Sequence, residues 1–207
     1  MAKAFTFAKI NGVNMKRVII IGASGSLAQY VIEALKGLND VELTLFVRNK
    51  NRLSTKVSTG CTLVEGDAMN YNDVEKAVSG HDIVYVNLAG HLETMAKNIV
   101  QAMEEMNVKR IIAISSIGIY QTPLRSVLIP YRRLADVVEN SKLDYTILRP
   151  DWFTDADEIK YAITRKGEPE KGTAISRKSI AAFIATIIQS PELYTRENLG
   201  ISKPEHN

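Results

Sequence analysis

Short, continuous apolar runs rich in valine and isoleucine recur along most of the chain. Residues 18–21, 83–86 and 111–114 are the clearest of them. A strand that is covered on both faces has such an uninterrupted run, whereas a half-exposed strand alternates apolar and polar residues. The runs therefore predict buried strands, as in a parallel sheet, at residues 18–21, 41–47, 61–64, 83–86, 111–114 and 144–148.

Between these runs, apolar residues recur every three or four positions, which is the spacing of one helical face. Leu27, Val31, Ala34 and Leu38 show it after the first run. Strands that alternate with helices form right-handed βαβ units, so we expect an α/β fold, a doubly wound parallel sheet with helices on both faces. The helices are predicted at residues 27–38, 74–78, 92–106, 134–141 and 178–190, and an exposed loop at 163–171.

Composition and charge narrow the class of protein. The chain has 207 residues, 45% hydrophobic and 24% charged, as is usual for a globular domain. A formal net charge of +3 is too small to indicate nucleic-acid binding. No apolar run approaches the roughly 18 residues of a membrane-spanning helix. Cys61 is the only cysteine, so no internal disulfide forms, which favours a cytoplasmic location.

We expect one folded domain. Residues 1–14 lack a continuous apolar stretch, and we interpret them as a flexible leader or extension. Residues 15–207 are expected to form a single domain, in which residues from about 151 to 207 make a small region on the substrate side. A monomer and a homodimer both remain open.

The turn after the first predicted strand carries the first chemical signal. It has the spacing Gly22-x-x-Gly25-x-x-Ala28 and opens the first predicted helix. Gly22 permits a tight turn, Gly25 lets a pyrophosphate approach the backbone, and Ala28 allows close packing of the helix. The helix N-terminus before Leu27 then offers amide donors to phosphates, to which Ser24 and Ser26 add hydroxyl donors. This predicts a Rossmann-type dinucleotide site; the alternative is a plain strand–helix turn.

The end of the second strand distinguishes between the two nicotinamide dinucleotides. NAD-binding sites usually have Asp or Glu there, to bind the ribose 2′-hydroxyl. This chain has Arg48, with Lys50 and Arg52 nearby, and a cation pairs with a 2′-phosphate. We therefore expect NADP, with NAD possible. The alternative is that these cations belong to a solvated loop.

Several motifs in order resemble the atypical short-chain dehydrogenase/reductase family of NAD(P)H-binding proteins, which includes NmrA-like, flavin reductase-like and biliverdin reductase-like members. The likeness spans residues from about 16 to 202. It rests on the GASG turn at 22–25, the stretch 65–84, the serine pair at 115–116, SKLDYTILRP at 141–150 and the helix start at 175–181.

The resemblance implies roles for individual residues. Asp67, followed by Ala68, would contact the adenine, and Ser115 would lie near the nicotinamide. Arg149 and Pro150 would close the substrate side. The cofactor would also be lined at the end of the fourth strand by Asn87, Leu88 and Ala89.

The usual catalytic pair of the larger family, Tyr-x-x-x-Lys, is missing. Counting back from residues 141–150, Arg132 occupies the lysine position and Leu128 the tyrosine position. Tyr131 and Tyr120 are the nearest tyrosines, and with Ser115 and Arg132 they are the catalytic candidates; the alternative is that both tyrosines only pack. His91 is a further candidate proton donor, and Trp152 and Phe153 are candidates to stack on a flat ring or to cap the core.

Two functions remain in view. The first is an oxidoreductase that transfers hydride from NADPH to a small or planar acceptor, in which the protein mainly orients the reactants. The second is a non-catalytic NADP(H)-sensing regulator of the NmrA-like type, which the missing pair favours. A third function, epimerisation or dehydration of a sugar nucleotide, is less favoured, because such enzymes usually need that same pair and a larger C-terminal substrate region than is present here. No metal-ligand spacing and no G-x-S-x-G motif is present.

Overall fold

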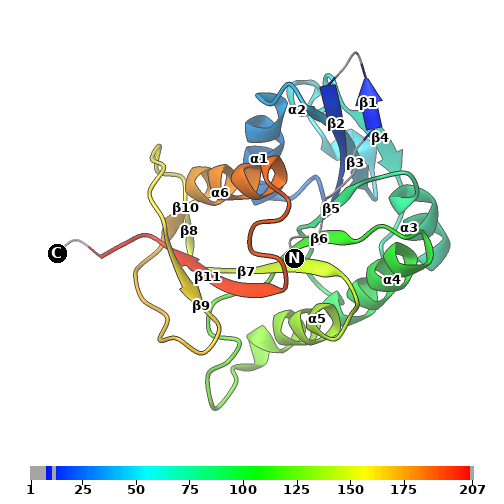
Figure 1. Ribbon diagram of the computed structural model, residues 1–207. Coiled ribbons are helices and arrows are strands. Elements are labelled where there is room, and N and C mark those ends of the chain that lie inside the picture. Colours follow the sequence, from blue (N-terminus) through cyan, green and yellow to red (C-terminus); the bar gives the residue numbers. More distant parts are fainter. Residues whose placement is uncertain (1–7, 11–12, 206–207) are drawn as a thin grey trace.

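A nine-stranded sheet forms the centre of the molecule (Figure 1). The structure is a computed structural model and describes residues 8–10 and 13–205. Eight strands follow one another in the order β4-β3-β2-β5-β6-β7-β11-β9, and β1 pairs with β2 outside this path. The strands are β1 (Ala8–Ile10), β2 (Val13–Ile21), β3 (Val41–Val47), β4 (Thr62–Glu65), β5 (Ile83–Val86), β6 (Arg110–Ile114), β7 (Asp144–Pro150), β9 (Ala162–Arg165) and β11 (Glu197–Ser202).

The order of the strands is that of a doubly wound sheet. From β2 the chain first moves outward to β3 and β4, then crosses back to β5 on the other side of β2 and continues to β6 and β7. All these neighbours are parallel. The expected α/β Rossmann-type class is confirmed. Such sheets bind ligands outside the carboxyl ends of the strands at the point where the direction reverses, here between β2 and β5.

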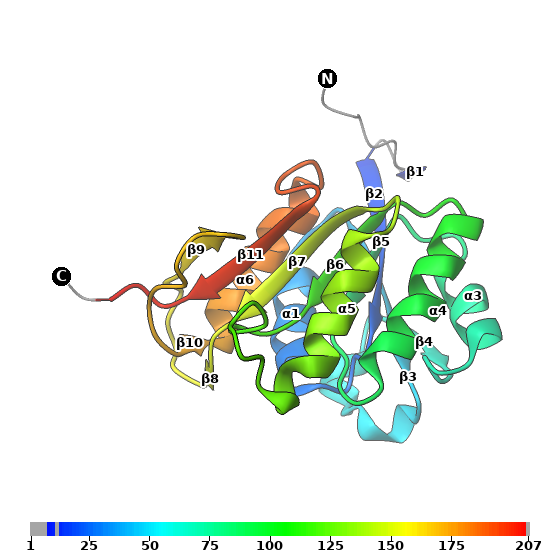
Figure 2. The same ribbon diagram turned by 90° about the horizontal axis from the view of Figure 1, so that it is seen from below.

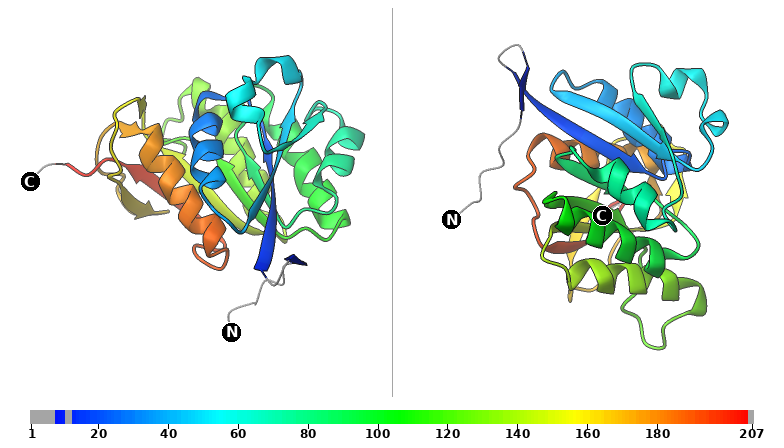
Figure 3. Two further views of the ribbon diagram at one scale, coloured as in Figure 1. Left: turned by 90° about the horizontal axis from the view of Figure 1, so that it is seen from above. Right: turned by 90° about the vertical axis from the view of Figure 1, so that its right-hand side faces the viewer.

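Helices cover both faces of the sheet. Figure 1 and the left view of Figure 3 show α1 and α6 side by side on one face, and Figure 2 shows α4 and α5 on the other, with α3 next to α4. The helices are α1 (Ser26–Lys36), α2 (Thr55–Ser58), α3 (Tyr71–Val78), α4 (Leu92–Glu105), α5 (Ile129–Glu139) and α6 (Arg177–Gln189), with short 3-10 turns η1 (Lys50–Arg52) and η2 (Ser126–Leu128).

The run at residues 18–21 shows why a continuous apolar strand is needed. All four side chains are fully buried. Because successive side chains of a strand point to opposite faces, Val18 and Ile20 pack with α1 and α6, whereas Ile19 and Ile21 pack with the helices of the other face. Each face of the sheet thus has its own apolar core.

Two antiparallel strands were not predicted. Residues 163–171 were expected to be a loop, but β9 includes the first of them and pairs antiparallel with β11. β1 pairs antiparallel with β2, so the expected leader at residues 1–14 overlaps both strands; residues 1–7 and 11–12 lie outside the described part. A separate parallel pair, β8 (Phe153–Thr154) and β10 (Ile175–Ser176), lies beyond the end of β7.

Within residues 8–10 and 13–205, no helix is long and apolar enough to cross a membrane. The same residues contain no cluster of three or more histidine, cysteine or acidic side chains that could hold a metal ion.

Candidate functional site

The turn between β2 and α1 is tightly packed against the end of β5. Gly22 has a φ of +90°, and a Cβ there would lie 2.2 Å from the carbonyl oxygen of Asn87. A Cβ on Gly25 would lie 2.5 Å from Asn87 Nδ2. The amide of Gly25 donates to the Gly22 carbonyl at 3.0 Å. Gly22 therefore requires glycine for both its backbone conformation and space, whereas a Cβ at Gly25 would meet the end of a side chain that can move.

The N-terminus of α1 is open to an anion. Gly25 is its N-cap residue, no side chain caps the helix, and no acidic residue lies in the first turn. The first amide groups of a helix have no partner within the helix, and its dipole is positive at this end. The chain therefore presents a glycine turn and free amide donors at one place, as a pyrophosphate requires.

A cavity of about 1000 Å³ begins at this turn and extends along the carboxyl ends of the strands. Volumes of about 300–1,000 Å³ are typical of small-molecule and cofactor sites. Most of the predicted cofactor residues line it, namely Gly22, Ser24, Gly25, Ser26, Leu27, Arg48, Asp67, Ala68, Asn87, Leu88, Ala89, Ser115 and Pro150. The predicted turn, the end of β3 and the end of β5 thus meet at one site.

At one end of the cavity, cations follow β3. Arg48 and Arg52 both line it, with Asn49 between them. Among the described residues, neither arginine side chain has an ion pair or a hydrogen bond. Asp67 lies beside them, and its Oδ1 accepts a hydrogen bond from the Met69 amide at 3.0 Å. This end therefore offers two unpaired guanidinium groups and one carboxylate.

The middle of the cavity is formed by the serine pair after β6. Ser115 is 3% exposed, its amide donates to the Leu148 carbonyl at 2.7 Å, and its hydroxyl donates to the Tyr131 carbonyl at 3.0 Å. Ser116 and Tyr131 line the cavity too, so two of the four catalytic candidates, Ser115 and Tyr131, lie at it.

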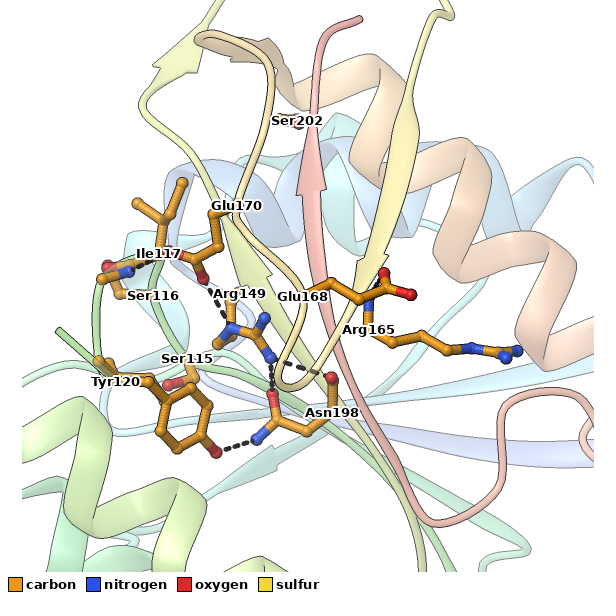
Figure 4. Close-up of polar contacts among 12 residues, drawn as sticks. Ser115, Ser116, Ile117, Tyr120, Arg149, Arg165, Glu168, Glu170, Asn198 and Ser202 are labelled. Carbon is orange, nitrogen blue, oxygen red and sulfur yellow. Dashed lines mark hydrogen bonds and ion pairs between the residues drawn. The ribbon is translucent and has the colours of Figure 1, made fainter.

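Tyr120 and Arg132, the other two candidates, do not line the cavity. The Tyr120 hydroxyl accepts from Asn198 Nδ2 at 2.7 Å (Figure 4). It also donates to Glu139 at 3.2 Å. Burial, with Glu139 as a second cause, raises the pKa of this phenol. Arg132 lies 4.8 Å from the centre of the Tyr120 ring and pairs with Asp136 at 2.7 Å. Both side chains are held by partners outside the cavity, so the structure does not bring these two candidates to the site.

The position of Arg149 also differs from what the family resemblance implied. Its side chain is 1% exposed and is absent from the lining of the cavity, whereas the adjacent Pro150 lines it. Nη1 donates to the carbonyl oxygen of Asn198 at 2.9 Å and to its Oδ1 at 2.5 Å, and Nε donates to Glu170 at 2.9 Å (Figure 4). Arg149 therefore does not close the substrate side but belongs to a polar cluster behind it.

The far end of the cavity includes residues that the sequence did not single out. The segment between β6 and α5 contributes Ile117, Gly118, Gln121, Arg125 and Val127, and also Leu128, which occupies the tyrosine position of the missing pair. One signal could have found it, because the segment follows the carboxyl end of a parallel strand, where ligands bind. His91, Trp152 and Phe153, which were considered, also line the cavity. The site therefore extends beyond the dinucleotide turn toward Trp152.

Comparisons with known proteins agree with this geometry. The NAD(P)H-binding family model matches residues 22–191. A Rossmann-fold NAD(P)-binding family protein from Shigella flexneri is 42% identical, with a TM-score of 0.86 over 93% of this chain and 96% of that one. A short-chain dehydrogenase/reductase from Veillonella parvula, solved in complex with NADP, is 26% identical, with a TM-score of 0.81 over 91% and 95%.

A curated relative is similar over a shorter stretch. The isoflavone reductase homolog A622 of Nicotiana tabacum is 29% identical over 153 residues, which are 67% of this chain and 49% of that protein. The chain thus spans about half the length of this relative. With the family model matching from the first glycine of the turn to beyond α6, the chain belongs to the NAD(P)H-binding family.

Proposed function

We propose that the chain is an NADPH-dependent reductase that transfers hydride to a small or planar acceptor. The observation that carries this is the continuity of the cavity. One space of about 1000 Å³ joins the helix N-terminus at Gly25 to the aromatic residues Trp152 and Phe153, with Ser115 between them. A site for a dinucleotide alone needs no open space lined by aromatic residues beyond the serine pair.

The residues divide into a holding group and an orienting group. The turn at Gly22 and Gly25 fits a pyrophosphate, because a Cβ at either position would fill the turn. Ser115 and Tyr131 line the cavity further along, where we expect the nicotinamide ring, and the Ser115 hydrogen bond to the Tyr131 carbonyl fixes that wall. When bound, the reduced dinucleotide supplies the hydride, and the protein supplies orientation and exclusion of water.

The preference for NADP rests on Arg48 and Arg52. Both line the cavity at the end of β3, where an NAD-binding site has an acidic residue, and their guanidinium groups have no partner among the described residues. A 2′-phosphate provides such a partner. The NADP-bound relative from Veillonella parvula is consistent with this preference.

The planar acceptor rests on the far end of the cavity. Trp152 is 76% exposed and Val127 is 62% exposed, although both line the cavity. The ring of Phe153 lies 5.1 Å from the guanidinium of Arg177, which fixes one of its faces. An exposed apolar patch that is rimmed by polar residues is typical of a ligand-binding groove or another interaction site. A flat ring can stack on such side chains.

Turnover with NADPH tests the reductase. Purified protein is mixed with NADPH and, in turn, with FMN, riboflavin, a quinone and a small carbonyl compound, and the NADPH absorbance is followed. We expect consumption with at least one planar acceptor. Trp152→Ala should raise the KM for that acceptor by about threefold to tenfold and leave the NADPH affinity unchanged. Ile159→Ala, which removes another exposed apolar side chain outside the cavity, should change neither.

A specific observation favours the second function, a non-catalytic NADP(H) sensor. Tyr120 and Arg132, the tyrosine and the cation nearest to the positions of the missing catalytic pair, are held by other partners and do not line the cavity. Tight NADPH binding without turnover on any acceptor would contradict the reductase and support the sensor.

A charge reversal tests the choice of dinucleotide. Arg48→Asp should reduce the ratio of NADPH to NADH affinity by about tenfold to a hundredfold, because it removes one charge-assisted contact and adds repulsion. Lys50→Asp makes the same change in net charge at a position outside the cavity and serves as the control. An unchanged ratio in Arg48→Asp would show that Arg48 belongs to a solvated loop.

A further inference from the structure

In the connection between β9 and β10, residues 166–172 are attached to the carboxyl ends of β7 and β11 and to α5. We call these residues the strap. Lys166 at its start pairs with Glu139 of α5 at 2.8 Å. Near its end, the carbonyl oxygen of Lys171 accepts a hydrogen bond from Ser202 of β11. The strap is therefore fixed at both ends, although its middle residues are exposed.

One strap residue reaches inward. The carboxylate of Glu170 accepts from Arg149 Nε at 2.9 Å through Oε1 and from the amide of Gly118 at 3.0 Å through Oε2. Figure 4 shows Glu170 between Arg149 and the chain at Ile117. One carboxylate thus joins the strap, β7 and the segment that follows β6.

The Gly118 amide belongs to the wall of the cavity. Gly118 has a φ of +80°, and its carbonyl accepts from the Gln121 amide at 3.1 Å, which forms a turn. Ile117, Gly118 and Gln121 all line the cavity on the side of Val127 and Trp152. Glu170 is not in that lining. It therefore acts on the wall through the Gly118 amide, without contact to the space inside.

Arg149 fixes the carboxylate from behind. Its guanidinium is buried and is itself held by two hydrogen bonds to Asn198 of β11. A buried cation with fixed partners holds the facing carboxylate in one place through a charge-assisted hydrogen bond. The position of the wall is thus set by the main sheet, through Arg149 and Glu170.

We propose that Glu170 is a positioning residue, which holds the turn at Gly118 so that the acceptor end of the cavity keeps its shape. That this end of the cavity binds an acceptor rests on the proposed function, whereas the role of Glu170 in holding the turn does not. Loss of the Glu170 carboxylate should weaken the binding of a planar acceptor by about fivefold or more, because a displaced wall loses contact with the ligand. The dinucleotide turn lies at the other end of the cavity, so NADPH affinity should not change.

Three variants test this. Glu170→Ala removes the carboxylate, and Glu170→Gln keeps a carbonyl oxygen that can accept from Gly118 but loses the charge that faces Arg149. Glu168→Ala is the matched control on the same strap, because Glu168 is exposed and accepts from the Arg165 amide within its own turn at 2.7 Å.

Two readouts need no turnover. Amide hydrogen exchange of Gly118 should be faster by about tenfold or more in Glu170→Ala, intermediate in Glu170→Gln and unchanged in Glu168→Ala. Fluorescence titration of the NADP⁺-loaded protein with FMN should show weaker binding in the same order. NADPH titration should give the same dissociation constant for all four proteins.

The outcomes separate the two proposals. If the wild-type protein turns over no acceptor, the proposed reductase function is wrong. Amide exchange at Gly118 and the affinity for FMN still test the role of Glu170, because neither measurement needs turnover. Unchanged Gly118 exchange in Glu170→Ala overturns the positioning role, whatever the activity. Equal effects in Glu168→Ala and Glu170→Ala also overturn it, since they would reflect general loosening of the strap. Faster exchange with unchanged FMN affinity would show that the turn does not shape the acceptor end.

Discussion

The two glycines of the dinucleotide turn should respond differently to the same substitution. In Gly22→Ala, the new methyl group lies 2.2 Å from a backbone oxygen, that of Asn87, and φ is +90°. The positive φ alone costs about 1–2 kcal/mol, and the backbone atom cannot rotate away. We expect the free energy of unfolding to fall by about 2–4 kcal/mol and the Tm by roughly 5–10 °C.

In Gly25→Ala, the conflict is with Nδ2 of Asn87, at the end of a side chain that can rotate, and φ is −69°. The loss of stability should therefore be about 1 kcal/mol or less. The methyl group, however, occupies the place where a pyrophosphate approaches the helix N-terminus. We expect the dissociation constant of NADPH to rise by about tenfold or more.

Urea and thermal unfolding measure the first effect, and fluorescence titration with NADPH measures the second. Gly37→Ala is the control, because its φ is −73° and its Cβ would only touch the Ala34 carbonyl at 3.4 Å, an ordinary contact. It should change neither quantity. If Gly25→Ala binds NADPH within about twofold of the wild-type protein, the turn does not hold the phosphates. If Gly22→Ala unfolds at the wild-type temperature, the strain argument is wrong.

Three further predictions concern buried polar groups. The Tyr85 hydroxyl has no hydrogen-bond partner among the described residues, so Tyr85→Phe should leave the free energy of unfolding unchanged or raise it by about 1 kcal/mol in urea unfolding; a clear fall would reveal a partner such as a buried water. Burial lowers the pKa of His81 below 6.5, so the unfolded chain binds more protons below that pH. Stability should fall as the pH drops through 6.5, and unfolding curves of His81→Gln should show a smaller fall; an equal fall would place the effect elsewhere. Arg149→Met leaves the Glu170 carboxylate without its cation and Asn198 Oδ1 without the Arg149 donor, and should lower the free energy of unfolding by about 3 kcal/mol; a loss below about 1 kcal/mol would show that the ion pair is dispensable.

The strands that alternate with helices could be predicted because their pattern is local. The runs at 41–47 and 83–86 coincide with β3 and β5. β11 was missed because Asn198 and Gly200 are unfavourable in strands. The neighbouring strands β7 and β9 determine the extended conformation of β11. Gly200 leaves room for β9, since a Cβ there would lie 2.3 Å from the Thr164 hydroxyl. Such pairing between distant segments leaves no periodicity in the sequence.

The two ends of the candidate site also differ in how far the sequence predicts them. The dinucleotide end consists of a spaced glycine turn and the ends of neighbouring strands, so its residues could be named in advance. The acceptor end depends on Gly118, Gln121 and Val127, which lie in a connection without apolar periodicity. It also depends on Glu170, from a strap more than fifty positions away in the sequence. The chemistry of that end follows from tertiary contacts alone.

The dipeptide of Arg149 and Pro150 explains why a motif match does not by itself assign a ligand contact. The two residues are neighbours in β7, and successive side chains of a strand point to opposite faces, so a ligand on one face meets only one of them. Pro150 lines the cavity, and its carbonyl accepts from the Ile117 amide at 3.1 Å. Arg149 faces away and holds the Glu170 carboxylate, which accepts from the amide of Gly118, the residue that follows Ile117. The dipeptide therefore secures one wall twice, directly through a backbone oxygen and indirectly through a buried ion pair. The match of this dipeptide to the family motif is consistent with a structural role in that wall. Arg149 can have this role without contacting the ligand.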